Sequence, residues 1–238
     1  MNSSRAPRIE IAALDRAEIL LEPWSWPFAV ERRDEIEACF AALRRRRSGV
    51  WNGRILLLKD CAIEGRALRG VCFEADYASL CAWREWNFPD ARVANFFGAA
   101  ALRAADGGFL VGEMAPSTAN AGMLYFPCGT PEPADVGPAG RVDLAGNVGR
   151  ELREETGIGI GELQAEPGWT MVRDGNYLAL LKRVDAPQSA EDLRARIMAH
   201  IAGESRPEFA GIRIVRSPAD FDPAMPRFVT AFLEEFWA

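Results

Sequence analysis

The sequence has few of the residues on which many catalytic sites depend. Histidine occurs once, at His200, and lysine twice, at Lys59 and Lys182. One imidazole excludes zinc sites that need two histidines, and a Ser-His-Asp or Cys-His site would have to use His200. Neither lysine follows a glycine and no G-x-G-x-x-G run occurs, which excludes two common phosphate-binding loops.

Cysteine is also sparse, with five residues and no C-x-x-C spacing. We therefore expect reduced thiols that pack as small hydrophobic side chains in a cytoplasmic protein. Residues 1–21 are rich in charge and have no apolar core, so a signal peptide is not expected. No apolar run reaches 18 residues, so we expect no membrane span.

Acidic residues are plentiful, with 34 Asp and Glu against 28 Lys and Arg and a formal net charge of −6. This balance argues against a nucleic-acid partner bound through overall charge. Chemistry in this chain is expected to use carboxylates, and clustered carboxylates usually bind a hard divalent cation.

The 238 residues suffice for one large domain or two small ones, and 49% hydrophobic residues allow a sizeable core. Predicted helices cover 29–47, 77–86, 143–156, 189–202 and 226–237. Predicted strands lie within 8–22, 54–61, 67–74, 93–103, 109–113, 123–127, 162–172, 177–184 and 209–215. This order predicts an α+β fold, as an α/β/α sandwich with a mixed sheet (91–238) behind a β-rich N-terminal accessory region (1–90).

One predicted helix carries three glutamates at a distinctive spacing. Glu151, Glu154 and Glu155 are related as i, i+3 and i+4, so they share one helix face beside an apolar stripe. Two carboxylates about 5 Å apart repel by roughly 3 kcal/mol at an effective dielectric near 20. Arg150 can supply one compensating charge, and Mg²⁺ or Mn²⁺ could supply the rest.

The simplest alternative is a solvated acidic helix, which is the commoner meaning of three glutamates at this spacing. The longer string, Arg-Glu-apolar-x-Glu-Glu-x-Gly-apolar over 150–158, favours a site. It should arise by chance in about 1 in 100,000 chains of this length.

This string resembles the second half of the Nudix hydrolase signature, G-x5-E-x7-R-E-U-x-E-E-x-G-U, in which U is apolar. The first half matches if Gly129 is its glycine and Asp135 replaces its glutamate. Between Asp135 and Arg150 lie 14 residues where the family has seven. The insertion lengthens the loop and leaves the carboxylate helix intact.

The resemblance implies a loop–helix–loop motif that hydrolyses a nucleoside diphosphate linked to another moiety. It implies that Glu151, Glu154 and Glu155 bind the divalent metal, Mg²⁺ or Mn²⁺, and that the Gly129 backbone completes the metal site. It also assigns catalysis to Glu151, Glu154 and Arg150: a carboxylate activates water, and Arg150 orients the cluster by pairing with a helix carboxylate. Such chemistry needs cations to neutralise phosphate oxygens, but no histidine or lysine.

A second similarity concerns the substrate. Residues 126–133 read F-P-C-G-T-P-E-P, similar to the F-P-G-G-H-P-E-P approach in UDP-sugar-hydrolysing Nudix enzymes, which also carry an N-terminal extension. A UDP-sugar is therefore a candidate to test first. Proline stiffening of the turn is an equally good explanation of these residues.

Two other functions stay open besides hydrolysis of a nucleoside-diphosphate derivative. One is a catalytically silent Nudix-fold module that binds a nucleotide as a regulator, and the other is an interaction protein whose acidic helix is mere surface. The expected partner is a small-molecule nucleotide, without nucleic acid or membrane, and a homodimer is left open.

Several further residues have two interpretations each. Glu208 precedes a late strand, where Nudix domains often place an accessory acid, but a surface acid is the simpler interpretation. For His200 we expect a structural or surface role. The arginines at 44–47 could grip phosphates, although a solvated helix end is favoured. The aromatic residues of 76–86 could stack on a base or pack a helix, and the polar loop 117–122 could touch a ligand or form a turn.

Overall fold

The computed structural model describes residues 8–47 and 49–238. Its helices are α1 (Pro27–Glu31), α2 (Arg33–Arg46), α3 (Tyr77–Glu85), α4 (Leu144–Thr156), α5 (Ala190–Gly203) and α6 (Arg227–Trp237). Its strands are β1 (Glu10–Leu14), β2 (Arg16–Leu21), β3 (Arg54–Glu64), β4 (Ala67–Asp76), β5 (Asn95–Arg103), β6 (Phe109–Met114), β7 (Leu124–Tyr125), β8 (Cys128–Gly129), β9 (Gln164–Ala165), β10 (Trp169–Asp174), β11 (Tyr177–Asp185) and β12 (Phe209–Val215).

The main sheet has the order β1-β10-β11-β5-β6-β12, with β7, β8 and β9 paired to its inner strands. β11 and β5 pair in parallel and the other neighbours are antiparallel, so the sheet is mixed. The central strand β5 is almost wholly buried, as expected of a strand covered on both faces. The predicted hairpin at 106–108 is confirmed, with Gly107 in the left-handed region at φ 86°.

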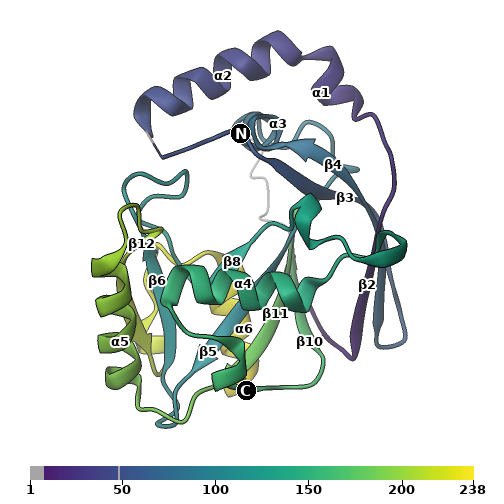
Figure 1. The fold of residues 1–238 in the computed structure, drawn as a ribbon. Helices are drawn as coiled ribbons and strands as arrows, with labels where there is room; N and C mark the ends of the chain where they lie inside the picture. Colours follow the sequence, from purple (N-terminus) through teal and green to yellow (C-terminus); the bar gives the residue numbers. More distant parts are fainter. Residues whose placement is uncertain (1–7, 48) are drawn as a thin grey trace, which may run out of the picture.

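Helices cover both faces of this sheet (Figure 1). On β5, Gly98 faces α4, since a Cβ there would lie 2.6 Å from Val148 Cγ2. The neighbouring Phe97 packs edge-on against Phe228 of α6, with ring centroids 5.1 Å apart. Because adjacent strand residues point to opposite faces, α4 and α6 lie on opposite sides of the sheet. The α+β fold with its three layers is therefore as expected.

A second, smaller unit is built from the N-terminal part of the chain. It has the sheet β2-β4-β3 and the helices α1, α2 and α3, which share an aromatic core that includes Trp26, Phe73 and Trp83. We call residues 16–88 the N-terminal unit. The helix predicted over 29–47 is divided into α1 and α2 at Arg32, whose φ of −115° leaves the helical region.

The N-terminal unit is fixed to the main sheet by backbone hydrogen bonds and a shared core. Leu58 and Ala94 exchange two backbone hydrogen bonds of 2.9 and 2.8 Å. A third apolar cluster combines Leu56 and Leu58 with residues of the main sheet such as Leu178. The boundary near residue 90 stays a prediction, and β1, which precedes that position, lies in the main sheet.

Two simpler expectations concern cysteine and the membrane. All five cysteines are free, and Cys72 is fully buried. Within 8–47 and 49–238, none of the helices combines the length and the apolar character needed to cross a membrane.

Candidate functional site

The carboxylate helix α4 begins and ends close to the predicted residues. Asp143 accepts a hydrogen bond from the Gly146 backbone N–H at 2.9 Å and so caps its N-terminus. Gly157 follows its last residue at φ 70°, a left-handed position that favours glycine. Val148 and Leu152 are buried against the sheet, so the helix can turn only its remaining face towards a ligand.

The three glutamates of α4 do not share one environment. Glu155 is only 5% exposed, and its Oε2 accepts a hydrogen bond from the Cys128 backbone N–H at 3.0 Å. Its other oxygen, Oε1, is buried and accepts no hydrogen bond from the described residues. The Glu151 side chain is 13% exposed, whereas the Glu154 side chain is 54% exposed. The site therefore has two inward carboxylates and one at its outer edge.

Gly129 of β8 lies directly against Glu151. A Cβ at Gly129 would lie 2.1 Å from Oε1 of Glu151, closer than atoms can approach. The glycine thus brings the backbone of β8 and the carboxylate together. Gly129 and Glu151, which the resemblance assigns to one metal site, are neighbours in the structure.

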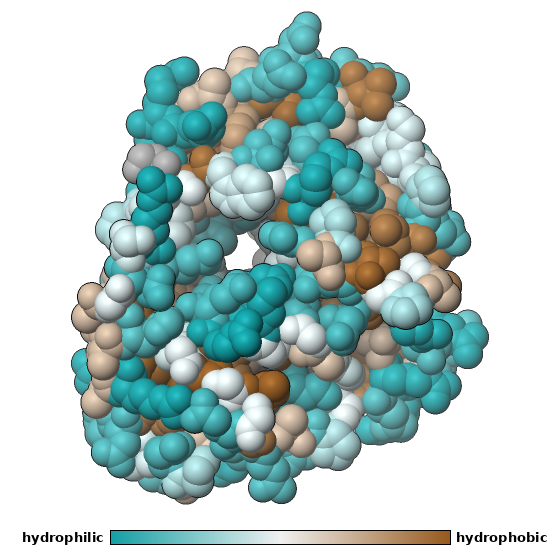
Figure 2. All heavy atoms as spheres, viewed as in Figure 1, coloured by the Kyte–Doolittle hydropathy of each residue, from teal (hydrophilic) through white to brown (hydrophobic). Residues whose placement is uncertain are grey.

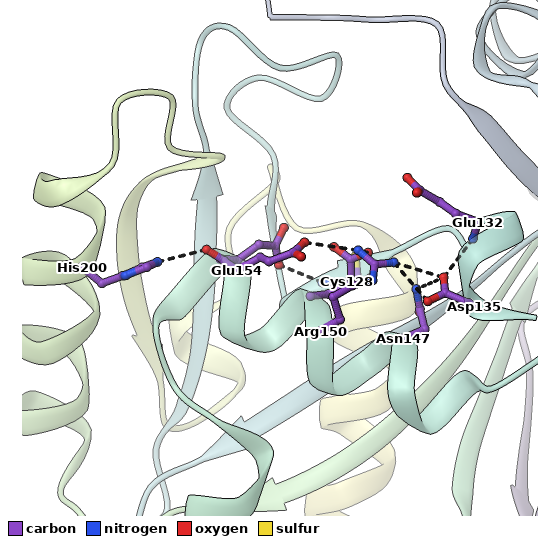
Figure 3. A network of polar contacts seen from close by, with 9 residues as sticks. Cys128, Glu132, Asp135, Asn147, Arg150, Glu154 and His200 are labelled. Atoms are coloured by element: carbon purple, nitrogen blue, oxygen red, sulfur yellow. Dashed lines mark hydrogen bonds and ion pairs between the residues drawn. The ribbon is translucent and has the colours of Figure 1, made fainter.

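Arg150 connects the helix to the loop before it (Figure 3). Its Nη1 lies 2.9 Å from Glu151 Oε1 and 3.2 Å from Glu154 Oε2. Its Nη2 lies 3.1 Å from Asp135 Oδ2, and this loop carboxylate also accepts hydrogen bonds from Asn147 and from the Glu132 backbone N–H. Asp135 thus lies beside the carboxylate helix and pairs with Arg150, despite the longer loop.

Burial makes the inward carboxylates reluctant to ionise. Desolvation raises the pKa of Glu151 to about 7, although Arg150 acts in the opposite direction. Desolvation also raises the pKa of Glu155 well above its usual range, and repulsion from Glu208 and Glu151 adds to the shift. The pKa of Glu208 is raised by desolvation and by the charge of Glu154. Five acids, with Asp135 and Glu154 included, share the one guanidinium of Arg150, so this region is short of positive charge.

The residues present fit a divalent cation in their chemistry. They offer carboxylate oxygens, which Mg²⁺ and Mn²⁺ prefer. The buried Glu155 Oε1 lacks a hydrogen-bond donor, and Gly129 keeps its backbone within reach of Glu151. In the described part of the chain, however, no group of three or more His, Cys, Asp or Glu side chains is already arranged to hold a metal ion. Arg150 is the cation that Glu151 and Glu154 meet in this structure.

A cavity of about 870 Å³ lies between the N-terminal unit and the main sheet. Figure 2 shows a hollow in the middle of this face of the molecule. Glu151, Gly129 and Glu208 line one part of its wall. The aromatic residues in its wall are Trp51, Tyr77, Phe97, Tyr125, Tyr177 and Phe228. The inward carboxylates therefore face a space large enough for a nucleotide-sized ligand.

Other predicted candidates lie at different distances from this cavity. Glu208 and the loop 117–120 line it, and so do Tyr77 and Arg84 of α3. Trp83 is buried in the core of the N-terminal unit, so α3 packs with one face and lines the cavity with another.

His200 and the arginine cluster lie outside the cavity wall. Nε2 of His200 lies 3.0 Å from the Glu154 carbonyl oxygen, at the end of α4. Arg47 donates a hydrogen bond to the Pro116 carbonyl oxygen at 3.1 Å. The His200 contact is consistent with the structural role expected of it.

Sequence reasoning did not identify Arg84 as an individual site residue, nor Cys128 as the backbone donor to Glu155. No local pattern signals either contact, because each joins segments that are distant in the chain. The Nudix-like string pointed to the carboxylates, Arg150 and Gly129, but to neither of these contacts.

No family model and no curated protein matches this chain. Among solved structures, it is similar to RenU, a Nudix hydrolase from M. smegmatis, at 15% identity and a TM-score of 0.40, over 60% of this chain and 83% of that one. It is also similar to a MutT protein from Methanosarcina mazei Go1, at 18% identity and a TM-score of 0.36, over 60% of this chain and 92% of that one. At these values the likenesses decide neither family nor activity.

Proposed function

We propose that this protein is a metal-dependent hydrolase of the diphosphate linkage in a nucleoside-diphosphate derivative. The observation that carries the proposal is the pair of inward carboxylates, Glu151 and Glu155, which lie beside the Gly129 backbone at the cavity and have too few cations around them. The Nudix-like string that contains them supports the same activity. A UDP-sugar is the substrate to test first, because of the resemblance at 126–133.

Each residue has a distinct task in this proposal. The metal, Mg²⁺ or Mn²⁺, would be held by Glu151, Glu154, Glu155 and the Gly129 backbone. When bound, it would neutralise phosphate oxygens and lower the pKa of a bound water. Arg150 orients Glu151 and Glu154 and ties them to Asp135. Glu208 lines the cavity, and in this proposal it would be the accessory acid that accepts a proton from the attacking water.

The first experiment separates this proposal from its alternatives. The protein is incubated with UDP-sugars, ADP-ribose, NADH, dinucleoside polyphosphates and nucleoside triphosphates, with and without Mg²⁺, and products are identified by mass. We expect cleavage between the two phosphates of one class, dependent on the metal. Failure to cleave any of them in Mg²⁺ or Mn²⁺ would contradict the proposal.

Glu155→Gln tests the metal role directly. Glutamine keeps an oxygen that can accept the Cys128 N–H bond but removes the charge. We expect a folded protein with kcat/KM lowered by about 10³-fold, in the range observed when a charge-stabilising group is removed from an active site. Circular dichroism checks the fold. A variant with full Mg²⁺-dependent turnover would refute the assignment.

A catalytically silent nucleotide-binding module is the second candidate. One observation favours it: the described residues hold no ready-made group of three metal-binding side chains. It predicts binding of a nucleotide without turnover in the same panel, measured by calorimetry.

A further inference from the structure

Arg84 is the charged residue that the N-terminal unit contributes to the cavity wall. It lies in α3, on the helix face that also places Tyr77 and Leu80 at the cavity. Positions i, i+3 and i+7 share a face, so α3 turns one continuous stripe towards this space. The stripe lines the same cavity as Gly129 and Glu151, although it comes from the other unit.

The charge of Arg84 is not matched within the described residues. Of the other cavity arginines, Arg227 pairs with Asp174 at 3.0 Å, and Arg206 lies on an exposed loop. No carboxylate of residues 8–47 and 49–238 lies within ion-pair distance of Arg84. Arg84 is half-buried, and a partly desolvated guanidinium without a matching anion favours a ligand that supplies one.

Neutral groups hold Arg84 in place. Its Nη2 donates a hydrogen bond to Asn120 Oδ1 at 3.0 Å, and the Asn120 amide donates to the Tyr125 hydroxyl at 3.1 Å. The guanidinium carbon lies 5.8 Å from the centroid of the Tyr177 ring. These contacts fix the side chain but use few of its five N–H donors. The remaining donors suit the oxygens of a phosphate group.

The rim of the cavity offers a surface for an aromatic group. Trp51 is 69% exposed although it is large and apolar, and its ring lies against Gly53, where a Cβ would be 2.9 Å away. An exposed tryptophan at a cavity mouth is suited to stack on a planar ring. The cavity thus combines an aromatic rim, an unmatched cation and the carboxylates of α4.

We propose that Arg84 binds the diphosphate group of a nucleoside-diphosphate ligand, so that the N-terminal unit completes the binding site. The inference rests on the proposed function for the identity of the ligand. It goes further by assigning the anion-binding residue to α3, outside the Nudix-like string. Arg84 thereby acts on affinity, while the residues of α4 act on cleavage.

The test is binding of UDP, ADP, GDP and CDP in Mg²⁺ by calorimetry, to the full chain and its variants. We expect Arg84→Gln to raise the Kd of the preferred nucleotide by about 10- to 100-fold, the range of one charge-assisted contact. Arg84→Lys keeps the charge and should lose less. Arg92→Gln is the matched control, because the Arg92 side chain is 67% exposed and lies outside the cavity wall, so this variant should bind like wild type.

A purely structural role for Arg84 predicts a different pattern. It predicts a lower Tm for Arg84→Gln, whereas removal of an unmatched charge should leave the Tm unchanged or higher. If Arg84→Gln does not fold, the Kd of Arg84→Lys is measured instead. A Kd of Arg84→Lys equal to that of wild type would overturn the inference. The same holds if wild type binds none of the four nucleotides, or if Arg84→Gln binds equally well. Binding that depends on Arg84 without any hydrolysis would contradict the proposed function and support this inference.

Discussion

Acidic side chains of α4 and of the turn that follows it have opposite electrostatic surroundings. On the cavity side of α4, desolvation raises the pKa of Glu151 to about 7 and also raises that of Glu155. In the turn at residues 160–162, Glu162 accepts hydrogen bonds from Arg196 at 2.7 and 2.9 Å and from the Gly159 N–H at 2.8 Å. These bonds lower the pKa of Glu162 to about 2.

The difference separates structural acids from functional ones. The charge of Glu162 is matched by its own chain, so no ligand is needed to explain it. The inward carboxylates have too few cations around them to ionise readily, and a bound divalent cation would make up this shortage. The same residue type therefore has a structural role in the turn after α4 and a candidate binding role on the cavity side of α4.

After Glu155→Gln, the largest effect on the inward carboxylates is expected from Gly129→Ala. The added Cβ would collide with the end of the Glu151 side chain, which can move away more easily than backbone can. We expect kcat/KM to fall by about 100-fold while the Tm changes little. The control is Gly161→Ala, since a Cβ there meets nothing within 4 Å. Equal activity of the two variants would show that the position of Glu151 is unimportant.

Arg150→Met tests the shortage of positive charge. It removes the cation shared by Asp135, Glu151 and Glu154, and we expect the free energy of unfolding to fall by about 2 kcal/mol without divalent ions. Because Mg²⁺ would then be the remaining cation, it should raise the Tm of the variant more than that of wild type. A Tm insensitive to Mg²⁺ in both proteins, measured by calorimetry, would argue against a metal site.

Glu162→Gln is expected to have the smallest effect on stability, and it tests the acid whose charge is matched by its own chain. A lowered folded-state pKa means that the ion pair stabilises the protein above the unfolded pKa of about 4.3 and loses this effect as the pH falls towards 2. Since the pair is exposed, we expect a Tm difference of about 2 °C or less at pH 7. The difference should shrink with acid, and hydrolytic activity should not change. Thermal melts at several pH values measure this.

Local patterns in the sequence predicted much of the fold. The helix 143–156 and its caps follow from the apolar spacing, Asp143 and Gly157, and the structure has α4 at Leu144–Thr156. The division of the predicted helix 29–47 into α1 and α2 was not predicted, because no proline or glycine marks Arg32. On either side of the break, Phe28 and Ile36 are both buried in the core of the N-terminal unit.

By itself, the sequence determined that three carboxylates and an arginine lie on one short helix, because helical spacing depends only on neighbours in the chain. Only the tertiary structure decided that Glu151 and Glu155 turn inward while Glu154 stays exposed, that Asp135 reaches Arg150 across a long loop, and that Arg84 lines the same cavity. These relations join residues far apart in sequence. They depend on how the two sheets pack together, which no local spacing encodes.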